Sequence, residues 1–140
     1  MRLRTALVAD DCSLTGEVHA GLLQAIGYRT TLVASGNEAA LAFQRATVAG
    51  EPFDLVLLDH DMPDGDGPTA ARLIRALEPW PRAVPMLCVT GRPVERLETA
   101  CLVAGFDRVL AKPLTVEALR QSVVLPDPSR QSRRPDATLR

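Results

Sequence analysis

Residues 54–67 read DLVLLDHDMPDGDG, and this stretch decides the fold. It opens on a short apolar run, Leu55–Leu58, with an aspartate on either side. An uninterrupted apolar run of this length is typical of a strand that is buried on both faces of a parallel sheet. The acidic and glycine-rich residues that follow favour a loop. The stretch therefore predicts a buried strand with carboxylates at its carboxyl end.

The rest of the chain repeats this unit, because short apolar runs alternate with longer stretches of helical period. We expect strands over five runs: Ala6–Ala9, Thr30–Val33, Leu55–Leu58, Val84–Val89 and Arg108–Leu110. Apolar residues at helical spacing predict five helices, marked by Leu14, Val18, Leu22 and Ile26; by Ala40 and Phe43; by Ala70, Leu73, Ile74 and Leu77; by Leu97, Ala100, Cys101 and Ala104; and by Val116, Leu119 and Val123. The alternation predicts an α/β fold, a doubly wound (βα)5 sandwich around a five-stranded parallel sheet.

Capping and turn residues support these limits. Helix starts are predicted by Ser35 with Glu38, by Pro68 and Pro93, and by Thr115; helix ends are predicted by Gly27, Gly50 and Gly105.

The amino-acid composition excludes several classes of protein. The 140 residues suffice for one domain with its own core, and 46% hydrophobic with 24% charged residues exclude a mainly disordered chain. A formal net charge of −1 argues against binding nucleic acid through bulk charge. No apolar stretch reaches the ~18 residues of a membrane span, and the start does not resemble a signal peptide. We expect no membrane or direct nucleic-acid partner, and a cytoplasmic location.

Three cysteines without CxxC spacing argue against a disulfide framework and a zinc cage. Beyond residue 125 the composition changes, because residues 126–140 hold three prolines and four arginines with almost no apolar residues. We expect a folded domain over 1–125 and a flexible Pro/Arg-rich tail over 126–140.

Polar residues interrupt the apolar runs at their carboxyl ends, where open α/β sheets place ligands. These residues are Asp10, Asp11, Asp59, Thr90 and Lys112. In the common strand order 2-1-3-4-5 the three carboxylates lie together, and two such charges at 4 Å repel by about 4 kcal/mol. A raised pKa or a divalent cation offsets this repulsion, and an all-oxygen site suits Mg²⁺. A carboxylate beside that metal can attack a phosphoryl group, for which a lysine and a hydroxyl are suitable donors.

As a set, these motifs resemble the response-regulator receiver domain (CheY-like) of two-component signalling, a flavodoxin-like fold. The matching segments, in the family's order, are Ala9–Asp11, residues 54–67, Val89–Gly91 and Ala111–Pro113, and the resemblance covers roughly residues 4 to 125. It implies that Asp59 is the phosphoacceptor and that the metal is held by Asp10, Asp11, Asp59 and the backbone carbonyl of Asp61. It further implies phosphoryl-binding and switch roles for Thr90, Lys112 and Gly91, and structural roles for Pro63, Gly67 and Pro113, with a cis bond before Pro113.

The resemblance also implies a function. A receiver takes a phosphoryl group from a phosphohistidine, on a sensor histidine kinase or a histidine phosphotransfer domain, with Mg²⁺ as cofactor. Its own chemistry is self-phosphorylation and slow self-hydrolysis, so we do not expect a turnover enzyme, and we expect the signal to leave through protein contacts. One departure is Val109, where the family usually has an aromatic switch residue.

Two alternatives remain open. We expect a stand-alone receiver, and the first alternative is a receiver excised from a hybrid histidine kinase or a larger regulator. Asp59 and Asp61 also match the DxD of haloacid-dehalogenase-type phosphatases, although that motif normally follows the first strand and is followed by further acids after the lysine.

Overall fold

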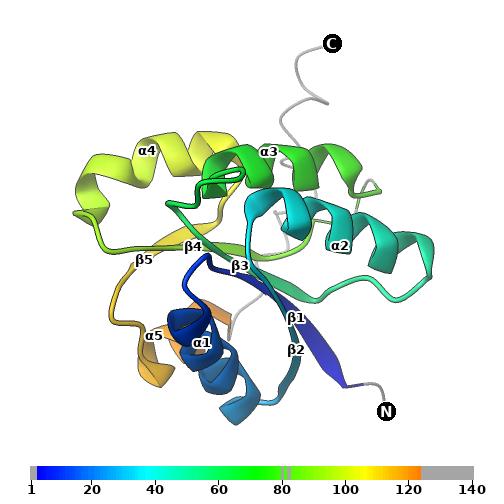
Figure 1. The fold of residues 1–140 in the computed structure, drawn as a ribbon, viewed down its shortest axis with the longest axis horizontal. Helices are drawn as coiled ribbons and strands as arrows, with labels where there is room; N and C mark the ends of the chain where they lie inside the picture. Colours follow the sequence, from blue (N-terminus) through cyan, green and yellow to red (C-terminus); the bar gives the residue numbers. More distant parts are fainter. Residues whose placement is uncertain (1–2, 80, 82, 124–140) are drawn as a thin grey trace.

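The computed structural model describes residues 3–79, 81 and 83–123. Within these residues, strands and helices alternate strictly (Figure 1). The strands are β1 (Arg4–Ala9), β2 (Tyr28–Val33), β3 (Leu55–Asp59), β4 (Met86–Thr90) and β5 (Arg108–Ala111). The helices are α1 (Ser13–Ala25), α2 (Gly36–Val48), α3 (Gly67–Leu77), α4 (Val94–Ala104) and α5 (Val116–Val123). The predicted tail over 126–140 lies outside the described residues, and the proposed domain limits stay a prediction.

The five strands form one parallel sheet of order β2-β1-β3-β4-β5, as predicted. Helices α2, α3 and α4 cover one face, and α1 and α5 cover the other (Figure 1). Successive strand residues point to opposite faces. Leu58 of β3 therefore packs in the core under α2, α3 and α4, whereas Leu57 packs in the core under α1 and α5. Every residue of β3 and β4 is buried, which explains their uninterrupted apolar sequences.

The predicted caps largely hold. The Ser35 hydroxyl accepts from the backbone N–H of Glu38 at 3.1 Å, although the Glu38 carboxylate reaches back to the Ala34 N–H. The Thr115 hydroxyl accepts from the Ala118 N–H at the start of α5. Pro93 is the cap residue before α4 and not its first helical residue. The three glycines predicted to end helices have positive φ: Gly27, Gly50 and Gly105.

The apolar stripe predicted for α1 is wrong at two positions. Leu14 and Val18 are 70% and 53% exposed, and α1 packs instead through a neighbouring face that includes Gly16 and Leu23. A Cβ on Gly16 would lie 2.8 Å from the Cδ1 atom of Leu32. The small residues of this face let α1 approach the sheet closely, which turns Leu14 and Val18 away.

Two smaller differences concern α3 and β4. Leu73 and Leu77 of the predicted α3 stripe are partly exposed, because α3 packs mainly through alanines and Ile74. Strand β4 begins at Met86 rather than at Val84, since the Val84 N–H donates to the Glu78 side chain and not to the sheet. Among the described residues, no helix combines the length and apolar character needed to cross a bilayer.

Candidate functional site

Three carboxylates meet at the carboxyl end of the sheet. Asp10 and Asp11 follow β1, and Asp59 ends β3, which is the neighbour of β1. Each offers an oxygen within 4.8 Å of the others. Asp10 is 2% exposed and Asp59 5%, whereas Asp11 is exposed to solvent. The strand order therefore produces the predicted acidic cluster from residues about fifty positions apart.

Asp10 is held rigidly but not fully satisfied. Its Oδ1 accepts from the backbone N–H of Cys12 at 2.9 Å, and its own N–H donates to the Val33 carbonyl. Its Oδ2 is buried and has no hydrogen-bond partner among the described residues, and Lys112 Nζ lies 3.6 Å from it. A buried carboxylate oxygen without a partner is rare in native proteins and calls for an ion or water.

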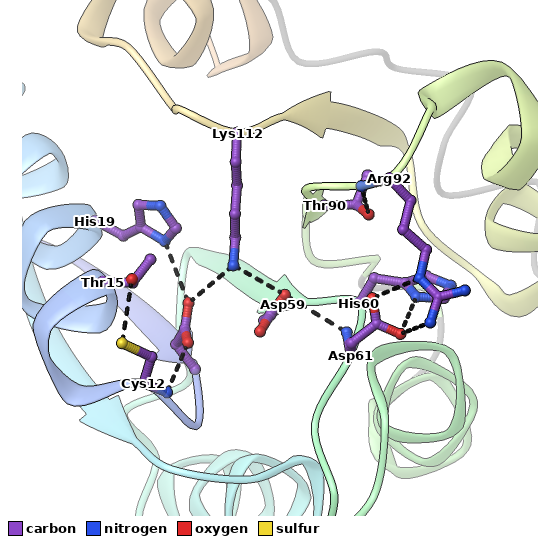
Figure 2. A network of polar contacts seen from close by, with 10 residues as sticks. Cys12, Thr15, His19, Asp59, His60, Asp61, Thr90, Arg92 and Lys112 are labelled. Atoms are coloured by element: carbon purple, nitrogen blue, oxygen red, sulfur yellow. Dashed lines mark hydrogen bonds and ion pairs between the residues drawn. The ribbon is translucent and has the colours of Figure 1, made fainter.

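Lys112 is the cation that faces this cluster. It follows β5, its backbone N–H donates to the Thr90 carbonyl, and the peptide bond to Pro113 is cis, as predicted. Figure 2 shows its side chain extending to the carboxylates, with Nζ 3.3 Å from Asp59 Oδ1. Burial alone would lower the pKa of Lys112, but the two carboxylates outweigh burial and raise that pKa. The ammonium group is therefore charged at neutral pH.

The carboxyl group of Asp59 has a raised pKa. Burial and the nearby charge of Asp10 raise the pKa of its carboxyl above the ordinary value, and Lys112 only partly opposes them. This is the signature of a carboxylate that lacks sufficient positive charge around it. A divalent cation at the cluster would remove the deficit.

Thr90 ends β4 beside Asp59's strand and is almost fully buried. Its hydroxyl accepts from the Arg92 backbone N–H at 2.9 Å, so the side chain fixes the start of the loop before α4. A Cβ at Gly91 would meet no atom within 4 Å, so the space beside Thr90 is open. The phosphoryl-binding roles of these residues and Lys112 stay predictions.

Asp61 points away from the acidic cluster. Its carboxylate forms a two-point ion pair with Arg92, with Nε–Oδ2 and Nη2–Oδ1 distances of 3.0 Å, and also contacts His60 Nδ1 at 3.2 Å (Figure 2). The loops after β3 and β4 are thereby joined. Its N–H lies 3.5 Å from Asp59 Oδ1. The metal role of its backbone carbonyl stays a prediction.

Three further residues that the sequence singled out are Gly67, Pro63 and Val109. The φ of Gly67 is not positive, so its backbone conformation does not require a glycine. What it provides is space, because a Cβ would lie 2.6 Å from the Asp59 carbonyl oxygen. The role of Pro63 stays a prediction. Val109 is buried in the core under α4, where a small aliphatic side chain fits.

His19 is a site residue that sequence reasoning missed. It lies on the buried face of α1, with Nδ1 3.8 Å from Asp10 Oδ2 (Figure 2). Burial lowers the pKa of its imidazole, with the Asp10 charge acting in the opposite direction, so the ring is neutral at neutral pH. The signal in the sequence is its spacing three residues after Gly16 and four before Leu23, which places it on the core face.

The donor set fits a hard divalent cation. The three clustered side chains supply only carboxylate oxygens, one of them buried and unpartnered, and Asp11 is open to solvent. Mg²⁺ prefers such oxygen donors and retains several waters. Asp10, Asp11 and Asp59 are therefore the residues that would hold it.

Comparisons with known proteins agree with this geometry. The sequence profile of the response regulator receiver domain matches residues 6–124. The signal transduction histidine-protein kinase BarA of Shigella flexneri is 35% identical over 115 residues, which are 82% of this chain and 12% of that kinase. The two-component response regulator ARR22 of Arabidopsis thaliana is 29% identical over 114 residues, 81% of this chain and 77% of ARR22.

A similar solved structure carries a metal. It is the receiver domain of sensor histidine kinase PA1611 from Pseudomonas aeruginosa PAO1, with a magnesium ion coordinated in its active-site cleft. It is 32% identical, superposes with a TM-score of 0.73, and the match covers 86% of this chain and 93% of that one. A CheY-like receiver from Methylobacillus flagellatus is 26% identical with a TM-score of 0.71, covering 86% and 95%.

Proposed function

This chain belongs to the response regulator receiver domain family of two-component and phosphorelay proteins, and on that premise we propose that Asp59 accepts a phosphoryl group from a phosphohistidine. The observation that carries the proposal is the setting of Asp59. Its carboxylate ends the central strand, lies with two further acids within 4.8 Å, and faces Lys112 at 3.3 Å. These are the parts that nucleophilic attack on phosphorus needs.

In the proposed reaction an Asp59 oxygen attacks the phosphorus and the P–N bond to histidine breaks, which leaves an aspartyl phosphate. Asp10, Asp11, Asp59 and the Asp61 backbone carbonyl would hold Mg²⁺, which when bound would supply positive charge to the phosphoryl oxygens. Lys112 contributes a charged donor on the side of Asp59 Oδ1. The Thr90 hydroxyl oxygen accepts from the Arg92 N–H, and its O–H can donate to a phosphoryl oxygen. Gly91 leaves that approach open.

The donor we propose is a sensor histidine kinase or a histidine phosphotransfer domain. The kinase relatives support this class of partner, and they equally support a role as the receiver part of a hybrid kinase, because BarA contains a segment like this chain. Hydrolysis of the aspartyl phosphate would be slow, so the protein acts as a phosphoryl carrier rather than as a turnover enzyme. The family match favours this reading over the dehalogenase-type phosphatase.

The test is intact-mass measurement after incubation with Mg²⁺ and a small phosphodonor such as phosphoramidate. We expect one alkali-labile phosphoryl adduct on the wild type and none on Asp59→Asn. The matched control is Asp61→Asn, which changes an acid two residues away whose side chain lies outside the cluster. It should keep the adduct. An adduct on Asp59→Asn, or equal labelling in EDTA, contradicts the proposal, and steady release of phosphate that depends on Asp61 would favour the phosphatase.

Lys112→Ala separates phosphorylation from response. The variant loses the cation that faces Asp59, but the main cores are untouched. We expect a folded protein in which an adduct on Asp59 no longer changes amide hydrogen exchange in the loop after Thr90. An unaltered exchange response in the variant would contradict the role of Lys112.

A further inference from the structure

Two cysteines lie against each other away from the acidic site. Cys88 is in the middle of β4 and Cys101 is in the last turn of α4, and their Sγ atoms are 3.9 Å apart. Both are free thiols with 0% exposure in the core under α2, α3 and α4. A disulfide requires a separation of about 2.05 Å, so the sulfurs need to approach by roughly 2 Å. The proposed receiver chemistry uses neither residue.

The helix that carries Cys101 has few buried residues. Only Cys101 and Ala104 of its eleven residues are buried, and Val94 and Leu97 are partly buried against the same core. Its first turn has no side-chain cap, because Pro93 stands at the cap position. Segments with few buried apolar contacts open locally at low free-energy cost. Opening of α4 would bring Cys101 into contact with solvent while Cys88 stays in the sheet.

We propose that Cys88 and Cys101 are a redox-modification site, in which a peroxide converts the two thiols into an intramolecular disulfide that ties α4 to β4. In the first step the Cys101 thiol loses its proton and the thiolate attacks one oxygen of hydrogen peroxide. The O–O bond breaks, which leaves a sulfenic acid and a hydroxide that takes up the proton to become water. In the second step the Cys88 sulfur displaces the hydroxyl group, which leaves as a second water. The two thiols lose two electrons and two protons in total, and one peroxide is reduced.

The closed structure protects the pair. Burial raises the pKa of both thiols, and for Cys88 the neighbouring Cys101 raises it further, so little thiolate exists while α4 is closed. Oxidation therefore proceeds from the open form, and closure brings the oxidised sulfur back to its partner. The rate of disulfide formation therefore depends both on how often α4 opens and on the peroxide concentration.

The crosslink has a consequence for signalling that rests on the proposed function. Strand β4 ends at Thr90 and α4 starts at Val94, so a bond between Cys88 and Cys101 closes a short loop around the switch hydroxyl. In the oxidised protein, a change at Thr90 cannot move α4 away from the sheet. Formation of the disulfide itself needs neither Mg²⁺ nor a phosphodonor.

The first experiment treats the full chain with hydrogen peroxide in a Cys12→Ser background, which removes the exposed third thiol. We expect a monomer whose intact mass falls by two hydrogen atoms, with a peptide map joining the segments of Cys88 and Cys101. Cys88→Ala and Cys101→Ala in the same background should each abolish that loss. Unmodified thiols, or oxygen addition without a crosslink, would overturn the proposal. Because no phosphate is involved, this outcome is independent of whether Asp59 is the phosphoacceptor.

The second experiment tests access through α4. Leu97→Ala removes packing from the buried side of the helix, and the matched change Leu102→Ala alters a residue of the same helix that is 48% exposed. The rate at which a thiol reagent labels Cys101 is measured in a background of Cys12→Ser and Cys88→Ala. We expect this rate to rise roughly tenfold with Leu97→Ala and little with Leu102→Ala. Equal rates for the two variants would overturn access by opening of α4.

Discussion

At the amino end of the sheet a partly buried arginine is paired with two acids and two backbone carbonyls, whereas at the carboxyl end three carboxylates cluster and a lysine pairs with two of them. The amino-end cation is Arg75 of α3. Its guanidinium donates to the carbonyls of Gly105 and Val84 and pairs with Glu78 and Asp107 at 2.9 and 3.3 Å. The two acids also accept backbone N–H groups at the start of β4. Each nitrogen of the Arg75 guanidinium and both carboxylate oxygens of Glu78 have a hydrogen-bond partner in this network.

The carboxyl end lacks that balance. Asp10 Oδ2 has no hydrogen bond from the described residues, and Asp59 has a raised pKa despite Lys112. Both ends combine acidic residues with one basic residue, but the amino end sets two acids against its cation and the carboxyl end sets three. Charges at the amino end stabilise the fold, and charges at the carboxyl end hold the site in a state that favours binding of a cation.

The largest expected effect is at the balanced end. Arg75→Ala removes the cation that pairs with Glu78, Asp107 and two carbonyls, and removing one partner of a largely buried ion network typically costs about 3–5 kcal/mol. Urea unfolding measures this loss. The control is Arg72→Ala on the same helix, an exposed residue whose loss should cost less than about 0.5 kcal/mol. Similar costs for the two variants would show that the network does not stabilise the fold.

Magnesium should produce the next largest effect, at the other end. A ligand that binds only the folded protein raises its stability by about 2.7 kcal/mol when present at 100 times its dissociation constant. We expect such a rise for the wild type and its loss in Asp11→Asn, measured by urea unfolding with and without Mg²⁺. Asp64→Asn, a change of an exposed acid outside the cluster, should keep the rise. Equal gains for both variants would place the ion elsewhere.

Replacing a buried acid by its amide should change the stability of the metal-free protein in opposite directions at the two ends of the sheet. Asp59→Asn removes a buried charge that its surroundings disfavour, and a gain of roughly 0.5–2 kcal/mol is expected. Glu78→Gln removes an equally buried charge that Arg75 favours, so it should lower stability. Urea unfolding in EDTA compares the two. Destabilisation by both would mean that the carboxyl end is not electrostatically strained.

The sequence predicted the carboxyl end far better than the amino end. The site residues each stand directly after a short apolar run, and the rule that parallel strands place ligands at their carboxyl ends brings them together without further information. The Arg75 network joins α3, the segment before β4 and the end of α4, and no local pattern connects these residues.

Other misses have the same cause. The face of α1 that touches the sheet depends on how closely Gly16 approaches Leu32, so counting apolar residues selected Leu14 and Val18 instead. For the same reason His19 was not placed beside Asp10. Local period identifies a helix, but its packing face is decided by tertiary contacts.

The smallest predicted effect concerns two helix caps at the carboxyl end of the sheet, neither of which is electrostatically strained. Asp66 and Ser35 accept backbone N–H groups at the starts of α3 and α2, from Thr69 and Glu38 respectively. Replacing either by Ala should cost about 1 kcal/mol at neutral pH. The bond from Thr69 holds the pKa of the Asp66 carboxyl below its usual value, so its charged form stabilises the folded state.

The two caps should therefore differ in acid. A group whose pKa is lowered by folding contributes fully above its unfolded pKa, 3.8 for this carboxyl, and the contribution is lost as the pH falls through the folded value. Urea unfolding at neutral pH and in this acidic window should show the cost of Asp66→Ala shrinking while the cost of Ser35→Ala stays constant. If both costs shrink together, loss of α2 and α3 packing in acid is responsible, and the carboxylate of Asp66 is not the group that titrates.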